Sequence, residues 1–170
     1  MGRASTKENK SVYQVKREEL GLTREKAADV LPGMSPDRIE KIENGKTHVH
    51  PEDILLMAEG YNAPGLNNWY CSHECPIGQK YVPELDMKDL SQIVLEMLAS
   101  MNSLKRDQER LIDISADGEI GNDELEDFIR IQNNLRRMAM TVDTLQFWSE
   151  EMLSSGRIDK DAYEALKAQM

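Results

Sequence analysis

Residues 20–46 have the sequence LGLTREKAADVLPGMSPDRIEKIENGK, and this stretch decides the fold of the first part of the chain. It contains start and stop signals for two short helices. Thr23 is a favourable N-cap for a helix over 24–31, because its hydroxyl can accept a hydrogen bond from a backbone N–H of the first turn. Pro32 and Gly33 end that helix.

The second helix of this stretch starts at Ser35 and Pro36, a hydroxyl cap followed by a proline at the first helical position. Ile39 and Ile42 are spaced so that both face inward. Residues 44–45, Asn-Gly, close the helix, because a left-handed residue after a helix is most often glycine. The stretch therefore predicts two helices joined by a tight turn.

Two more short helices flank this pair. Apolar residues at helical spacing predict one over 11–20, which Gly21 ends, and a further start signal begins at His50 and Pro51. The sequence NAPG at 62–65 predicts a loop. The first part of the chain is therefore expected to be a compact module of four or five helices.

Long helices are expected after residue 86, where apolar residues follow a four-three repeat. A turn at 116–118 between the two repeats predicts a helical hairpin. Residues 154–156 end the second long helix, and Asp159 can cap a short last one. The first repeat is Leu90, Val94, Met97, Met101, Leu104 and Leu111, interrupted by Gln108, and the second is Leu125, Phe128, Gln132, Leu135, Ala139, Val142 and Leu145.

Length and composition agree with an all-α protein of two parts. The 170 residues include 31% charged and only 5% aromatic side chains, a mixture typical of helices. We expect a helix-turn-helix domain over 1–70, a junction over 71–85, and an acidic helical domain over 86–170 that serves dimerisation or partner binding.

The net charge of −10 is unevenly distributed. Residues 1–70 hold 10 Lys and Arg against 11 Asp and Glu, whereas residues 71–170 hold 11 against 20. A strongly acidic total argues against a simple nucleic-acid binder, because phosphate contacts draw on basic side chains. The acidity is therefore a property of the second part.

A cytoplasmic location is expected. No stretch is apolar over the roughly 18 residues that a membrane span requires, and the first ten residues lack the apolar core of a signal peptide. Cys71 and Cys75 are too few for a disulfide framework.

Residues 11–64 resemble the lambda-repressor-like, or XRE-type, helix-turn-helix family. The resemblance rests on Gly-Leu-Thr at 21–23, the small residue Ala28, the tight turn, and Glu-Asn-Gly at 43–45 after Ile39 and Ile42. It implies a DNA-binding module whose second motif helix enters the major groove, while neighbouring helix ends hold phosphates.

The resemblance also implies the residues that bind double-stranded DNA. Thr23 and Arg24 are expected at the backbone, residues 36–38 and Lys41 at the groove, and Lys46 at a phosphate. Two departures from the family stand out: Arg24 occupies a position where an amide side chain is common, and Asp37 and Glu40 carry negative charge on the groove-facing side. The complete expected set is Thr23, Arg24, Ser35, Pro36, Asp37, Arg38, Lys41 and Lys46.

Residues 113–124 resemble an isolated EF-hand calcium loop, with Gly118 at the position of the sharp turn. An ordinary connector between helices requires the same Asp-Gly turn and capping acids, and EF-hands normally occur in pairs. We therefore favour no metal and no cofactor. If calcium binds, the expected ligands are Asp113, Ser115, Asp117, Glu119 and Glu124.

The sequence CSHEC at 71–75 combines two thiols with an imidazole, but a fourth zinc ligand is missing unless His48 or His50 folds back. Packing of the junction by Cys71 and Cys75 is the alternative that we favour.

The functional expectation is a non-enzymatic, bacterial-type, sequence-specific transcriptional regulator. It binds DNA through its N-terminal helix-turn-helix and forms a homodimer through its C-terminal helices. No arrangement of nucleophile, base and acid is visible around the three histidines. The alternative is a protein-binding adaptor that keeps the helix-turn-helix fold without binding DNA, with calcium responsiveness as a further variant.

Overall fold

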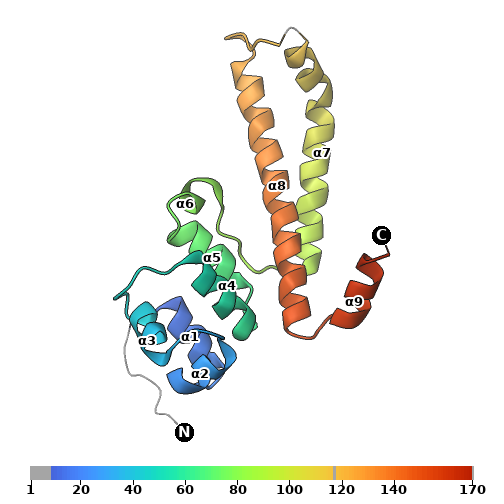
Figure 1. Ribbon diagram of the computed structural model, residues 1–170. Helices are drawn as coiled ribbons and strands as arrows, with labels where there is room; N and C mark the ends of the chain where they lie inside the picture. Colours follow the sequence, from blue (N-terminus) through green and yellow to red (C-terminus); the bar gives the residue numbers. More distant parts are fainter. Residues whose placement is uncertain (1–8, 117, 170) are drawn as a thin grey trace. The chain divides into compact units, whose positions relative to one another are not determined.

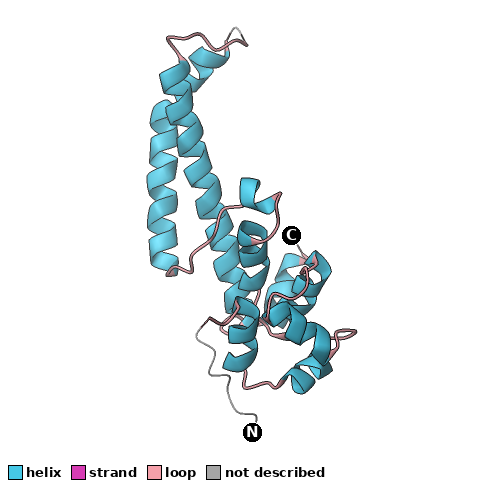
Figure 2. Cartoon of the chain, turned by 90° about the vertical axis from the view of Figure 1, so that its left-hand side faces the viewer, coloured by secondary structure: helices cyan, strands magenta, loops and turns pink. Residues whose placement is uncertain are grey.

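The computed structural model describes residues 9–116 and 118–169, and these residues form helices and loops without any strand (Figure 2). The expected all-α class is confirmed. The described chain divides into two compact units: one runs up to Glu84 and resumes at Glu150, and the other is Leu85–Ser149. This division differs from the expected one, because the residues from Glu150 onward group with the N-terminal module and not with the hairpin.

Six short helices make up the N-terminal part of the first unit (Figure 1). Both predicted caps are present: Thr23 Oγ1 accepts a hydrogen bond from the backbone N–H of Lys26 at 3.3 Å, and Ser35 Oγ accepts from Arg38 at 3.2 Å. The helices are α1 Val12–Glu19, α2 Arg24–Val30, α3 Pro36–Glu43, α4 Pro51–Gly60, α5 Gly65–His73 and α6 Gly78–Tyr81.

The turn after α3 also follows the prediction. Asn44 is the C-cap, and Gly45 has a φ of 64°, the left-handed conformation that glycine adopts without strain. This turn points the chain away from α3 and leaves Lys46 exposed.

The expected junction over 71–85 is partly helical, since it contains the end of α5 and all of α6. Helix α5 continues to His73, because Leu66 and Tyr70 on its inner side are buried in the module's core. Tyr70 also donates a hydrogen bond to the carbonyl of Val49, and Asn68 donates to the carbonyl of Pro83. The segment is thereby part of the N-terminal module.

One apolar core unites α1 to α5. The side chains contributed by the two motif helices, including Ala27 and Ile39, are fully buried. Burial of apolar surface on this scale is the main favourable contribution to folding. The core includes Tyr13, Leu31, Ile39, Ile42, Ile54, Met57, Tyr61 and Leu66.

A charged pair is buried beside this core. Arg17 on α1 donates through Nε and Nη2 to the two carboxylate oxygens of Glu43 on α3, at 2.5 and 3.1 Å, and through Nη1 to the carbonyl of Leu22. Arg24 on α2 also donates to Glu43, at 2.9 Å. The hydrogen bonds to Glu43 raise the pKa of Arg17 despite its burial. One carboxylate thus connects α1, α2 and α3.

The second unit contains two long helices, α7 Leu90–Ser115 and the greater part of α8 Leu125–Ser154 (Figure 1). The expected hairpin is therefore present. Asp117, in the expected turn, lies outside the described residues.

The residues buried between α7 and α8 differ from the expected four-three repeats. Several members of those repeats, including Val94, Met101 and Val142, are more than 40% exposed. The helices are instead rotated so that a partly polar set is buried, because Asp107 binds both Arg130 and Asn134, and Arg110 binds Asp127. The buried set is Ile93, Asp107 and Ile114 on α7, and Ile131, Asn134, Thr141 and Thr144 on α8.

The end of α8 contacts the N-terminal module within the first unit. The amide of Asn62 donates to the carbonyl of Ser154, and the backbone N–H of Gly65 donates to the Glu151 carboxylate at 3.1 Å. Helix α9, Lys160–Lys167, follows, and Asp159 caps it as predicted. These contacts explain why the chain's last residues group with the first unit.

The buried ion pair gives a test of stability. Glu43→Gln should lower the free energy of unfolding by about 3 to 5 kcal/mol, because the Arg17 charge then stays buried without its carboxylate. Glu40→Gln is the matched control: Glu40 lies on the same helix, is exposed, and approaches Arg24 only at 3.8 Å, so about 1 kcal/mol or less is expected. Urea denaturation followed by circular dichroism measures both, and equal losses would contradict this role for Glu43.

Candidate nucleic-acid interface

Helix α3 presents its N-terminal half to solvent. Residues 35–37, Glu40 and Lys41 are exposed, while Ile39, Ile42 and Glu43 are buried against the module. A helix held in this way can lie in a major groove with its first residues at the base edges. The geometry therefore suits the second helix of a helix-turn-helix.

Arg38, expected at the groove, is bound within the module. Its Nε donates to Asp53 Oδ1 at 2.8 Å, and Nη2 donates to the other oxygen of the same carboxylate. Burial alone would raise the pKa of Asp53, but the bonds from Arg38 and from the His50 backbone N–H lower it below its usual value. Arg38 thus fixes the start of α4 to α3.

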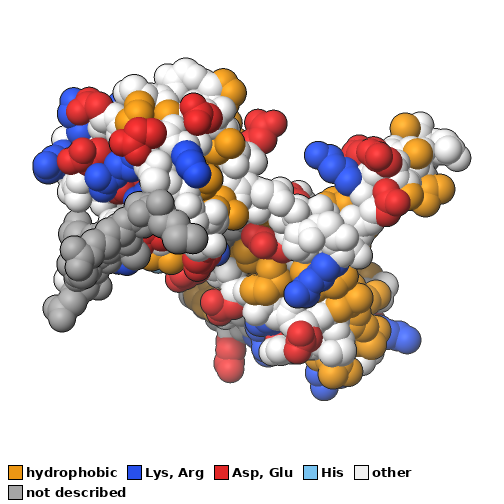
Figure 3. All heavy atoms as spheres, turned by 90° about the horizontal axis from the view of Figure 1, so that it is seen from below, with side chains coloured by type: hydrophobic (Ala, Val, Ile, Leu, Met, Phe, Trp, Pro, Cys, Tyr) orange, Lys and Arg blue, Asp and Glu red, His pale blue; other side chains and the backbone are white. Residues whose placement is uncertain are grey.

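The other two expected cations of the motif helices also have acidic partners. Arg24 donates to Glu43 and lies 3.8 Å from Glu40, and Lys41 lies 2.7 Å from Asp37 one helical turn earlier. In the view of Figure 3, Lys and Arg side chains lie next to Asp and Glu side chains. The positive face that the resemblance implies is therefore largely neutralised.

Two exposed lysines close to the motif helices have no ion pair within the described part of the chain. Lys46 follows the turn after α3, as expected, and Lys26 lies in the first turn of α2. Lys26 is not among the DNA-binding residues expected from the sequence. Its position three residues after the Thr23 cap, on the polar side of α2, is the signal that could have identified it.

The hydroxyls of Thr23 and Ser35 act as helix caps, and Pro36 occupies the first position of α3. Capping leaves the first N–H groups of α2 and α3 at the exposed helix ends. Such N–H groups, together with the helix dipole, favour a phosphate oxygen.

The candidate calcium ligands do not converge in the described residues. Asp113 and Ser115 belong to the last turn of α7, and Ser115 Oγ donates to the carbonyl of Ile112. Glu124 accepts from the backbone N–H of Gly121, and Asp117 lies outside the described residues. Calcium binding by Asp113, Ser115, Asp117, Glu119 and Glu124 remains a hypothesis.

Cys71 and Cys75 are half-buried free thiols that pack against the module's core. Burial, and secondarily the neighbouring Cys75, raises the pKa of the Cys71 thiol. His73 stacks on Trp69. Among the described residues, no group of three or more His, Cys, Asp or Glu side chains is placed to hold a metal ion.

The order of helices, the tight turn between α2 and α3, and the exposed start of α3 define a helix-turn-helix domain. Residues 16–67 match the family model of a helix-turn-helix domain, which supports the resemblance of the N-terminal module to XRE-like helix-turn-helix domains. Neither a curated protein nor a solved structure matches the chain significantly. None of the described helices is both long and apolar enough to cross a membrane.

The Arg38–Asp53 pair predicts a pH effect. Arg38→Gln should raise the pKa of Asp53, because it removes the guanidinium hydrogen bonds that hold this pKa down. A lowered folded-state pKa contributes stability above the unfolded value near 4, and this stability is lost as the pH falls through the folded pKa. The variant should therefore be less stable than wild type at neutral pH, with the difference shrinking in acid.

Carboxyl carbon NMR titration measures the Asp53 pKa directly. Lys41→Gln removes a neighbouring charge that does not contact Asp53, and it should leave this pKa unchanged. An Asp53 pKa that is the same in wild type and Arg38→Gln would show that the pair does not persist in solution.

Proposed function

We propose that the protein is a sequence-specific DNA-binding transcriptional regulator that acts as a homodimer. The observation that carries this proposal is the exposed N-terminal half of α3 on a helix-turn-helix scaffold matched over residues 16–67. This part of α3 is the element that contacts base edges in such domains.

The roles of individual residues follow from their positions. The capped starts of α2 and α3 and the lysines Lys26 and Lys46 contact phosphates, which set the register of the domain on the duplex. Residues at the start of α3, including Pro36 and Asp37, face the bases. Asp37 can accept a hydrogen bond from cytosine N4, and its pairing with Lys41 lowers the repulsion from nearby phosphates.

Replacement of Lys46 tests the phosphate contact. Lys46→Gln should weaken binding to all duplexes and lower the slope of log affinity against log salt by about one, because one phosphate contact is lost. Asp37→Ala should reduce discrimination at one base pair by about 1 to 3 kcal/mol, because it removes the carboxylate proposed to accept a hydrogen bond from cytosine N4. Fluorescence anisotropy with DNA from upstream of the gene measures both effects. Unchanged binding in both variants would refute the proposed interface.

Dimerisation is supported by the apolar face of the hairpin, which we define as Leu90, Val94, Met101 and Ile112 on α7 with Leu135 and Val142 on α8. Each of these side chains is more than 40% exposed. They lie roughly a quarter to a third of a turn around their helices from the buried set. On both helices, viewed from the N-terminus to the C-terminus, the exposed apolar residues are displaced from the buried set in the same rotational direction. Because α7 and α8 are antiparallel, this displacement places the apolar residues of both helices on one side of the hairpin.

A second copy of the hairpin is the occupant that fits this face. Contiguous exposed apolar surface of this kind is uncommon on a monomer, and two such faces related by a two-fold axis form a four-helix arrangement. The contact between α7 and α8 is rich in polar groups, so many apolar side chains of the hairpin are not buried by its internal packing. Symmetric dimers are also the form in which helix-turn-helix domains bind paired half-sites.

Charge placed in the apolar face tests this model. Met101→Glu should convert the full-length protein from dimer to monomer, because two carboxylates would be buried near the two-fold axis. Leu95→Glu is the matched control: Leu95 is 68% exposed and lies about 200° around α7 from Ile93, away from both the apolar face and α8. Light scattering at tens of micromolar gives the mass, and a monomeric wild type would refute the dimer.

A protein-binding adaptor is the second candidate function. The observation that favours it is the pairing of Arg24, Arg38 and Lys41 with acidic residues, which leaves few cations for DNA. A dimer that binds no upstream DNA at low salt would support this candidate.

A further inference from the structure

A second site lies at the middle of the hairpin, away from the apolar face. Six side chains from α7 and α8 line a hollow of about 370 Å³, here called the central hollow. They are Ser103, Arg106, Asp107, Arg130, Asn134 and Arg137. By helix geometry Arg106 and Arg137 lie on the opposite side of the buried set from the apolar face.

Asp107 organises the base of the central hollow. It is almost fully buried, and its carboxylate accepts hydrogen bonds from Arg130 and, at 2.6 Å, from the amide of Asn134. These two bonds and the nearby charge of Arg106 lower the pKa of Asp107, so the carboxylate is ionised at neutral pH. The negative charge of the hollow is thus already engaged by groups within it.

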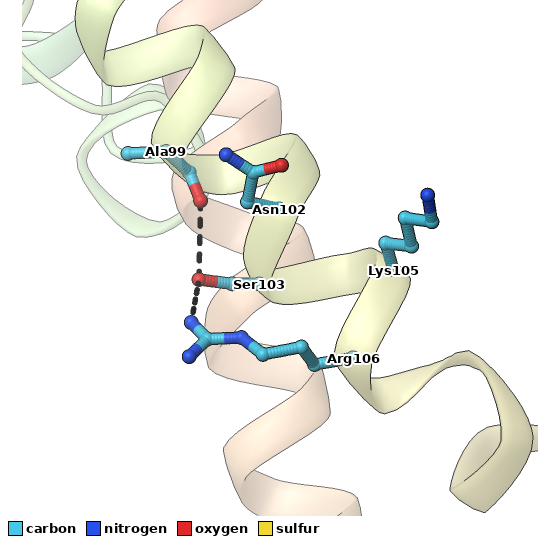
Figure 4. Close-up of a pocket in the computed structure, with 5 residues that line it drawn as sticks. All are labelled: Ala99, Asn102, Ser103, Lys105 and Arg106. Carbon is cyan, nitrogen blue, oxygen red and sulfur yellow. Dashed lines mark hydrogen bonds between the residues drawn. The ribbon is translucent and has the colours of Figure 1, made fainter.

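Arg106 and Arg137 are each held at one nitrogen only. Arg106 Nη2 donates to Ser103 Oγ at 3.3 Å, while Ser103 in turn donates to the carbonyl of Ala99, as Figure 4 shows. Arg137 Nη2 donates to Asn134 Oδ1. Neither guanidinium has a carboxylate within 4 Å in the described part of the chain. Both are therefore oriented by neutral groups and keep N–H donors available.

The charge balance of the hollow is opposite to that of the protein. Three guanidiniums and one carboxylate line it, although the whole chain carries −10. Arg130 is paired with Asp107 and also with Asp127, so the excess positive charge is that of Arg106 and Arg137. Six of the seven Lys and Arg residues between 85 and 149 lie at 105–110 and 130–137. Lys105 extends away from Ser103 and Arg106 (Figure 4), over an adjoining shallow hollow that shares these two residues. Positive charge is concentrated at this level of the hairpin.

We propose that the central hollow binds a small molecule through a phosphate or carboxylate group. Arginine is suited to this role because its planar fork donates two parallel hydrogen bonds to such oxyanions. The Ser103 and Asn134 side chains pre-orient the two forks, and Asp107 with Arg130 closes the base. The volume of the central hollow is larger than an isolated phosphate requires and is sufficient for a small metabolite. The central hollow lies on the opposite side of the buried set from the apolar face, so the proposed ligand site does not overlap the proposed dimer contact.

Calorimetric titration of the full-length protein tests the site with defined probes. Inorganic phosphate and citrate are titrated separately at constant ionic strength, with chloride as the reference anion, so that general screening is the same throughout. Wild type should bind at least one probe with a dissociation constant of millimolar or below. Binding of phosphate alone identifies a phosphoryl ligand, and binding of citrate alone identifies a carboxylate ligand.

Variants locate the binding. Arg106→Gln and Arg137→Gln should each weaken binding about tenfold or more, because each removes charge-assisted hydrogen bonds. Arg136→Gln is the matched control: it removes the same charge from the neighbouring position, which does not line the hollow. Glutamine is compatible with an exposed helical surface, so folding should be retained.

NMR of the arginine Nε–Hε groups in wild type gives a readout that does not depend on the variants. The resonances of Arg106 and Arg137 should shift with the probe, while that of Arg136 should not. Absence of binding by both probes in wild type would overturn the proposal. Equal binding by wild type and all three variants would overturn it as well, since it would show general anion attraction.

Discussion

The buried pair of Arg17 and Glu43 is the interaction on which the N-terminal domain depends. Its carboxylate lies at the end of α3 and receives hydrogen bonds from α1 and α2, so three helices share one charged centre. A buried ion pair contributes little net stability against an apolar alternative, but loss of one partner is costly. The pair therefore fixes the angle between the helices, and with it the exposed start of α3.

The same internal pairing shapes the chemistry of the candidate DNA interface. Arg24 and Arg38 hold helices together, so they have fewer donors for a duplex than a sequence match suggests. The caps at Thr23 and Ser35 and the lysines at positions 26 and 46 then carry more of the proposed phosphate contact. Affinity of such a domain would depend strongly on a second copy, because two weak sites on one duplex bind together far better than either alone.

In the hairpin, polar and apolar residues have different roles. Polar residues, above all Asp107 with Asn134, specify how α7 and α8 meet, and this register turns Val94, Met101 and Val142 outward. One side of the hairpin is consequently apolar, and the other carries the arginines of the central hollow. The apolar side can therefore contact a second hairpin while the arginine side binds an oxyanion, because the two surfaces do not overlap.

The sequence by itself determined the local features: the all-helical class, the caps at Thr23, Ser35 and Asp159, the Gly45 turn and the hairpin. These depend on signals within a few residues, such as a hydroxyl or a glycine at a helix end. Only the tertiary structure decided which charges are paired and which apolar row is buried. Arg17 and Glu43 are 26 residues apart, and Asp107 and Asn134 are 27 apart, so no local pattern reveals that they meet. A four-three repeat shows that a helix has an apolar side, but the partner across the contact decides whether that side faces α8 or the solvent.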